Sequence, residues 1–211
     1  MLDIAHHLNA IHREVGKRPD AGGEVIGVLL RRGYDASIED VWSALTDRDR
    51  LKQWFLPVSG ELTVGGRFQL EGNAGGEILQ CTRPHRVRVT FGAPTSIVEL
   101  RLSARGPSDT VLELEHTVPL AFVQNGAGSL YVGPGWDNAF MALARFLRGE
   151  VIQNPATASS SPEGQEFSKQ SVHAWAAAVK SSNTATADEI AAAAKVSMAQ
   201  FAPSHAGAGQ G

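Results

Sequence analysis

The stretch IVELRLSARGPSDTVLELEHTV, residues 97–118, alternates apolar and charged side chains with a period of two. Such alternation is typical of antiparallel strands that have one packed face and one solvated face. The turn residues GPSD, at 106–109, interrupt the alternation and divide the stretch into two strands. The sequence therefore predicts a hairpin whose inward face carries Leu100, Leu114 and His116, while glutamate and arginine side chains point outward.

The same period of two extends this hairpin into a larger sheet. RFQLEG at 67–72 and RVRVTF at 86–91 also alternate, and glycine, proline or asparagine residues separate the runs. By the same pattern, Phe68 and Phe91 share the inward face. We therefore predict an antiparallel meander from residue 59 to residue 118.

A long amphipathic helix is predicted after the meander, in GWDNAFMALARFLRGEV at 135–151. Its apolar stripe consists of Trp136, Phe140, Leu143, Leu147 and Val151. Burying each of these side chains contributes about 1.5–3 kcal/mol. A helix with so bulky a stripe is suited to packing across the inner face of a curved sheet.

The segments before the meander are predicted from shorter patterns. Apolar residues at helical spacing in residues 2–15 predict an amphipathic helix that ends near Gly16, and 17–23 is predicted to be a loop. EVIGVLLRRGYDA at 24–36 is predicted to be a strand, with apolar side chains on both faces over Val25 to Leu30. Two short helices follow, the second ending before Pro57 because a proline disfavours helical geometry in the residue before it.

The C-terminal part has a different composition. A polar linker precedes two predicted helices, at 163–182 and 186–201, and Thr186 is a plausible N-cap of the second. These helices are too weakly apolar to fold alone, so we expect them to pack on the main domain or on a second subunit of a homodimer. The resulting domain assignment is 1–23 for an N-terminal helix and loop, 24–154 for the main domain, 155–203 for the linker and helical extension, and 204–211 for a disordered tail.

Composition excludes several classes of function. The 211-residue chain has a formal net charge of −3 and a sequence pI of about 6.2, so it lacks the excess of basic residues that is typical of nucleic-acid-binding proteins. It has no run of 18 apolar residues, so no membrane span is expected. Cys81 is the single cysteine, which rules out an intrachain disulfide and thiolate-rich zinc sites and favours a cytoplasmic location. Phosphate-binding glycine motifs are missing as well, and we expect neither a cofactor nor a metal.

The motifs VWSALTD, LKQWFLP, VGGRFQLEGNAGGEIL, LELEHT and GWDNAF, in this order, resemble the SRPBCC (START-like) superfamily. The resemblance is to the branch named after the activator of the heat-shock-protein-90 ATPase and covers about residues 24–152. It implies an α+β helix-grip fold, in which a curved antiparallel sheet wraps around a long C-terminal helix, with extra helices at both ends of the chain. It also implies a cavity for an apolar ligand, whereas some members regulate chaperones and others are cyclases or hydrolases. Fold alone does not decide among these roles.

The residues expected to line such a cavity share the inward phase of the pattern or flank it. They are Trp54, Phe55, Phe68, Phe91, Leu100, Leu114, His116, Trp136 and Phe140. Trp54 and Phe55 have two interpretations. They pack in the core at one end of the sheet, which base rates of buried aromatics favour, or they line the mouth of the cavity.

His116 is the residue in this set that is best suited to acid–base chemistry. Paired with Glu77 from the neighbouring strand, or with Tyr131, it could act as a general acid or base. The alternative is a histidine satisfied by backbone or water near the end of a strand, which we favour because alternation commonly breaks there. The leading hypothesis is therefore a non-enzymatic module for a small hydrophobic ligand, ahead of a chaperone-regulating protein and of an enzyme.

Overall fold

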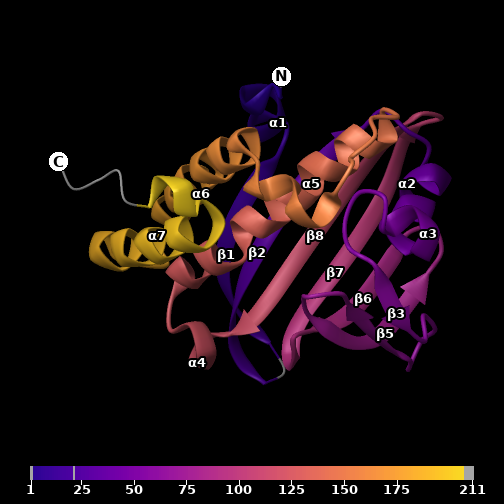
Figure 1. Ribbon diagram of the computed structural model, residues 1–211. Helices are drawn as coiled ribbons and strands as arrows, with labels where there is room; N and C mark the ends of the chain where they lie inside the picture. Colours follow the sequence, from indigo (N-terminus) through magenta and orange to yellow (C-terminus); the bar gives the residue numbers. More distant parts are fainter. Residues whose placement is uncertain (1, 21, 207–211) are drawn as a thin grey trace. The chain divides into compact units, whose positions relative to one another are not determined.

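The computed structural model describes residues 2–20 and 22–206 (Figure 1). The strands are β1 (His12–Asp20), β2 (Gly23–Tyr34), β3 (Val58–Gly60), β4 (Arg67–Leu70), β5 (Gly75–Thr82), β6 (Arg86–Phe91), β7 (Ala93–Gly106) and β8 (Asp109–Pro119). The α-helices are α1 (Ile4–Asn9), α2 (Ile38–Thr46), α3 (Arg48–Leu51), α4 (Leu120–Val123), α5 (Gly133–Leu147), α6 (Pro162–Ser182) and α7 (Ala187–Phe201). The described part of the chain also contains the 3-10 helices η1 (Gly126–Tyr131), η2 (Pro155–Ser160) and η3 (Pro203–His205).

The strands are hydrogen-bonded in the order β1-β2-β8-β7-β6-β5-β4-β3. The long helix α5 follows the last strand in sequence, so the predicted fold class, an α+β helix-grip fold with additional helices at both ends, is confirmed. The chain divides into two compact units. Unit 1 comprises Met1–Leu30, Val118–Met141 and Thr157–Gly211, and unit 2 comprises Arg31–Thr117 and Ala142–Ala156.

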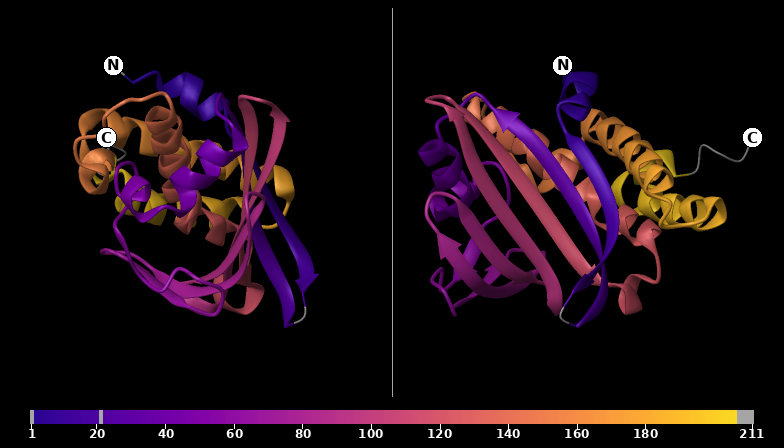
Figure 2. Two further views of the ribbon diagram at one scale, coloured as in Figure 1. Left: turned by 90° about the vertical axis from the view of Figure 1, so that its right-hand side faces the viewer. Right: turned by 180° about the vertical axis from the view of Figure 1, so that it is seen from behind.

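Unit 2 contains the predicted meander. Its strands β3 to β8 pair antiparallel with their neighbours in the chain, and β7 and β8 run side by side over most of their length (Figure 2). Gly76 of β5 has no room for a larger residue, because a Cβ there would lie 1.8 Å from the backbone carbonyl oxygen of Thr90 in β6. The short helix α2 is capped by Ser37, whose side chain accepts a hydrogen bond from the backbone N–H of Asp40.

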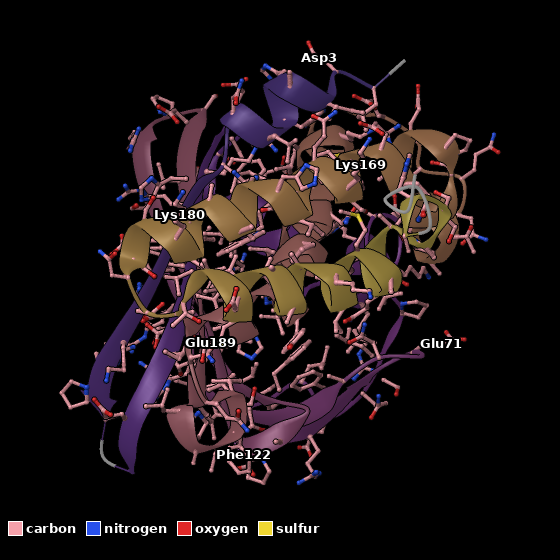
Figure 3. All side chains as sticks on the ribbon, turned by 90° about the vertical axis from the view of Figure 1, so that its left-hand side faces the viewer. Asp3, Glu71, Phe122, Lys169, Lys180 and Glu189 are labelled. Carbon is pink, nitrogen blue, oxygen red and sulfur yellow. The ribbon has the colours of Figure 1, made fainter. Side chains whose placement is uncertain are left out.

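Unit 1 contains the two helices predicted from the C-terminal sequence. They form an antiparallel hairpin, with Lys180 of α6 and Glu189 of α7 at the same end of the pair (Figure 3). The first turn of α7 is closed by a capping box between Thr186 and Glu189, which confirms the predicted cap. In α6, the side chains of Phe167 and Trp175 are fully buried within unit 1. The helices of the extension therefore pack within unit 1 of their own chain.

A buried carboxylate connects this extension to α5 and β1. Asp137 of α5 accepts hydrogen bonds at its Oδ2 from the Nε of Arg13 at 2.9 Å, the Oγ of Ser171 at 2.5 Å and the Nε1 of Trp175 at 3.1 Å. The side chain of Asp137 is completely inaccessible and that of Arg13 is 9% exposed. Burial raises the pKa of Asp137, and the adjacent Arg13 guanidinium opposes that shift. Three segments far apart in sequence thus meet at one charge pair.

The predicted N-terminal helix is wrong beyond Asn9, because residues 12–20 form strand β1 instead. The prediction rested partly on Ile11 and Val15, which are both buried. A spacing of four residues returns to the same face in a helix and also in a strand, so this pair could not distinguish them. Arg13, which lies between them in the sequence and belongs to β1, forms an ion pair with the buried Asp137.

Two further boundaries differ from prediction. The long helix was expected to reach Val151 but ends at Leu147, and Val151 is 85% exposed. Gly149, with a φ of +79°, has the left-handed geometry that commonly terminates helices. At the C-terminus, Ser204 belongs to η3 rather than to a disordered tail, and its hydroxyl donates to Gln165 at 2.9 Å. The remainder of the predicted tail, 207–211, lies outside the described residues.

Candidate functional site

The register of β6, β7 and β8 sorts their side chains onto two faces. Val89 lies opposite Val98, which in turn lies opposite His116, and residues directly opposite one another project to the same side of a sheet. We call this side the apolar face. It includes Val87, Val89, Phe91, Ser96, Val98, Leu100, Leu102, Ala104, Thr110, Leu112, Leu114 and His116. Leu100, Leu114 and His116 therefore share one face, as the sequence predicted.

The other side of the same three strands is the charged face. It carries Arg86, Arg88, Glu99, Arg101, Glu113 and Glu115. Glu99 lies at its centre, 2.8 Å from the Nη2 of Arg86 and 2.7 Å from the Nη1 of Arg101. Partial burial acts to raise the pKa of Glu99, but hydrogen bonds from these two guanidinium groups hold it below its usual value. This face is an ion-pair network of cross-strand neighbours.

Burial of the apolar face decreases from β8 towards β6. Leu112 and Leu114 of β8 are 1% and 2% exposed, and Val98 of β7 is 4% exposed. In contrast, the apolar side chains of β6 on this face, Val87, Val89 and Phe91, are all partly exposed, and so is Leu100. The β6 part of the apolar face therefore remains accessible from outside.

A polar pair lies within this face. The Oγ of Ser96 on β7 is 2.8 Å from the Nε2 of His116 on β8, and the ring of Phe91 packs edge-on against the imidazole at a centroid distance of 5.9 Å. His116 is 3% exposed, whereas Ser96 is partly exposed. Burial lowers the pKa of His116 to about 4, so the imidazole is neutral at pH 7.

Ser96 was missed because GAP at 92–94 looks like a turn and the strand was expected to begin after it. Strand β7 instead begins at Ala93. Continuing the alternation backwards from Val98 would have placed Ser96 on the inward face that also carries His116. That extrapolation was the available signal.

The predicted partner of His116, Glu77, lies on the opposite side of the sheet. Ile78 is opposite Val89 and therefore shares the apolar face, so the adjacent Glu77 projects away from it and is opposite Arg67 in β4. The pairing of His116 with Glu77 is therefore wrong, since a single step along a strand changes the face. Tyr131, the other predicted partner, ends η1 in unit 1 and is 41% exposed.

Trp54 and Phe55 follow α3 in unit 2. The Nε1 of Trp54 donates to the carbonyl oxygen of Ala44 in α2 at 2.9 Å, and its ring stacks on Phe55 at a centroid distance of 5.4 Å. Trp54 is 5% exposed, and Phe55 is partly exposed. This bond and burial favour the packing interpretation for Trp54.

The remaining predicted lining residues are distributed between the two units. Phe68 of β4 lies opposite Gly76 in unit 2 and is partly exposed. Trp136 and Phe140 belong to the part of α5 in unit 1, where Phe140 is 2% exposed and Trp136 is partly exposed. Their participation in one site with the apolar face stays a prediction.

Among residues 2–20 and 22–206, no group of three or more histidine, cysteine, aspartate or glutamate side chains could hold a metal ion. Within the same described part of the chain, every helix is too short or too polar to cross a membrane.

Comparison with known proteins places the chain in a family. The family described as "Activator of Hsp90 ATPase homolog 1-like protein" matches residues 35–148. The crystal structure of CalU16 from Micromonospora echinospora is 39% identical, with a TM-score of 0.67, and the match covers 81% of this chain and 98% of CalU16. A solution NMR structure of the same protein gives 38% identity, a TM-score of 0.68 and coverage of 82% and 97%. Among functionally curated proteins, no match was found.

More distant structures share the fold. A conserved protein of unknown function from Enterococcus faecalis is 20% identical, with a TM-score of 0.55 and coverage of 78% of this chain and 91% of its own. An HSP90 activator from Plasmodium falciparum is 22% identical, with a TM-score of 0.50 and coverage of 58% and 96%. The family match, the extensive similarity to CalU16 and the helix-grip topology lead to one conclusion: the chain belongs to the Activator of Hsp90 ATPase homolog 1-like family of the SRPBCC superfamily.

Proposed function

We propose that this protein binds a small apolar or amphipathic ligand on the apolar face of β6–β8. The observation that carries the proposal is the accessibility of Val87, Val89 and Phe91, which are partly exposed on a face whose residues Val98, Leu112 and Leu114 are buried. Apolar surface left accessible beside a few polar groups is characteristic of ligand sites. A ligand that covers these side chains would gain about 25 cal/mol for each Å² of apolar surface removed from water.

The pair of Ser96 and His116 gives this surface one polar point. At 2.8 Å the two side chains are hydrogen-bonded, and the partly exposed Ser96 is the member that a ligand could reach. Ligand pockets commonly use such isolated polar groups to fix the orientation of an otherwise apolar ligand.

A catalytic role for this pair is less favourable. A general base works best when its pKa is close to the working pH, because it must be both deprotonated and basic. Burial lowers the pKa of His116 to about 4, which makes it a weak base at neutral pH. We therefore propose binding rather than catalysis for His116, with Ser96 as its partner in place of Glu77 or Tyr131.

A pair of tryptophan variants tests the proposal. Leu100→Trp enlarges a partly exposed side chain on the apolar face, whereas Ile97→Trp places the same bulk on the other side of the same strand. Leu100 is preferred to Leu114, because Leu114 is 2% exposed and a tryptophan there would disturb the core.

The readout is the binding of the neutral dye Nile red, with circular dichroism to establish that each variant is folded. We expect Leu100→Trp to weaken dye binding at least tenfold and Ile97→Trp to leave it unchanged. Equal binding by the wild type and both folded variants would refute the proposed site. Native mass spectrometry of freshly purified protein would identify any ligand that co-purifies.

The family match favours a second proposal, regulation of a chaperone ATPase. It rests on the family description, and the HSP90 activator from Plasmodium falciparum adds support for the fold alone at 22% identity. Adding the purified protein to an Hsp90-type ATPase from the same source tests it. An ATPase rate unchanged at saturating protein would rule this role out for that chaperone.

A further inference from the structure

We propose that the apolar face selects uncharged ligands carrying a hydroxyl or carbonyl group over ligands of the same size carrying a carboxylate. This inference rests on the proposed function, because it assumes that a ligand occupies the face. It adds the chemical class of that ligand and the residue that recognises its polar group.

The first observation is the segregation of charge between the two sides of the sheet. The register of β6–β8 directs the arginine and glutamate side chains of these strands to the charged face. Among the described residues of β6–β8, the apolar face carries no charged side chain, and Ser96, His116 and Thr110 are polar. Thr110 is fully buried, and its hydroxyl donates to the carbonyl oxygen of Ala36. An anionic ligand on this face would thus find no cation supplied by these three strands.

The second observation concerns cations on the helices of unit 2. Arg50 of α3 is 2.6 Å from Asp40, and its guanidinium lies over the ring of Phe146. Arg145 of α5 is 2.7 Å from Glu150. Arg48 of α3 donates to the carbonyl oxygen of Gly60. A ligand carboxylate would have to compete with these existing partners for any of the three arginines.

The third observation is the chemistry of the Ser96–His116 pair. Ser96 can donate to a neutral imidazole and accept from a ligand hydroxyl, or it can accept from His116 and donate to a ligand carbonyl. Both arrangements involve neutral groups, and the low pKa of His116 means that the imidazole does not become a cation at pH 7. The pair therefore satisfies one neutral polar group without supplying a positive charge.

The relative affinities of neutral and anionic ligands should follow from these contacts. A neutral hydroxyl exchanges its hydrogen bond to water for one to Ser96, whereas a carboxylate loses the hydration of a full charge without gaining a counter-ion. We expect the neutral ligand to bind at least about tenfold more tightly, which corresponds to about 1.4 kcal/mol.

The test uses two fluorescent probes that share their ring system and chain length, 1-pyrenebutanol and 1-pyrenebutyric acid. Dissociation constants for the 211-residue protein are measured by fluorescence anisotropy at pH 7.5, where the acid is ionised. Tighter binding of the alcohol by tenfold or more supports the inference. Equal affinities, or tighter binding of the acid, overturn it and leave the proposed function standing, whereas failure of both probes to bind overturns the proposed function as well.

Variants identify the residues responsible. Ser96→Ala should weaken binding of the alcohol several-fold without affecting 1-butylpyrene, a probe that lacks the hydroxyl group. Val89→Lys adds a cation to the accessible part of the face and should shift the preference towards the acid, whereas Ile97→Lys, on the charged face, should not. A folded Val89→Lys protein with the wild-type preference would overturn the inference. If that variant does not fold, an unchanged affinity of Ser96→Ala for the alcohol would overturn it.

Discussion

Replacing Asp137 by asparagine should destabilise the protein far more than its single-atom change suggests. The carboxylate is fully buried, and its Oδ2 accepts from Arg13, Ser171 and Trp175 at 2.9, 2.5 and 3.1 Å. Asparagine keeps the shape of the side chain but removes the charge and turns one acceptor into a donor. Arg13, whose side chain is 9% exposed, would then be a buried cation without its counter-ion.

The expected cost is about 3–5 kcal/mol, the usual range when one partner of a buried ion pair is removed. For a chain of this length, that corresponds to a decrease in Tm of about 6–20 °C. Urea unfolding followed by circular dichroism and tryptophan fluorescence measures the change, and agreement of the two probes tests whether unfolding is two-state.

Two further variants separate the charge from the change in shape. Asp40→Asn breaks a pair in which both side chains are at least 30% exposed, and it should cost less than about 1 kcal/mol. The double variant Arg13→Met, Asp137→Leu replaces the pair with apolar side chains and should recover most of the loss, because no unpaired charge remains. A cost for Asp137→Asn no larger than that for Asp40→Asn would refute the reasoning.

The other predictions concern stability at three separate places. Between pH 6.5 and pH 4 the unfolded chain protonates His116 while burial keeps the folded imidazole neutral, so the wild-type free energy of unfolding should fall with decreasing pH by about 3 kcal/mol. In urea titrations, the pH-dependent loss of unfolding free energy should be smaller in His116→Gln, whereas His173→Gln, which replaces an exposed histidine, should show the wild-type loss. The opposite result would contradict the burial of His116. Gly133→Ala should lower the free energy of unfolding, measured by thermal unfolding, by about 1–3 kcal/mol, because a Cβ there would lie 2.4 Å from the ring of Trp175. Gly16→Ala is the control, since a Cβ at Gly16 would have no atom within 4 Å. Similar costs for the two variants would rule out the clash. Thr186→Ala removes the capping box and should cost about 1 kcal/mol, seen as faster amide hydrogen exchange in the first turn of α7, and unchanged exchange would argue against the cap.

Local patterns were sufficient to predict much of the sheet and most of the helices. The alternation in 97–118 correctly assigned Leu100, Leu114 and His116 to one face, because in a strand a period of two permits a single division of side chains. The same reasoning did not extend to Glu77, whose face could be assigned only after β5 was aligned with β6. It also failed at Ile11 and Val15, whose spacing fits a helix and a strand equally well.

The candidate site shows where sequence reasoning ends. His116 was identified from its position in the alternation, but Ser96 was overlooked because the residues before it look like a turn. The partial exposure of Val87, Val89 and Phe91 could not be predicted either, since all three fit the same inward pattern as the fully buried Leu112. Exposure depends on what covers a face, and periodicity carries no information about that.

By itself, the sequence determined the faces of the central strands and the positions of the major helices, because these follow from periodicity, capping and turn residues within short segments. The fold class was implied by the resemblance of its motifs to the SRPBCC superfamily. The tertiary structure alone decided that Arg13 meets Asp137, that the C-terminal extension packs inside unit 1, and that Ser96 rather than Glu77 bonds to His116. Arg13 and Asp137 are separated by 124 residues, and Ser96 and His116 by 20. Such contacts arise from strand register and long-range packing, which no local pattern of side chains encodes.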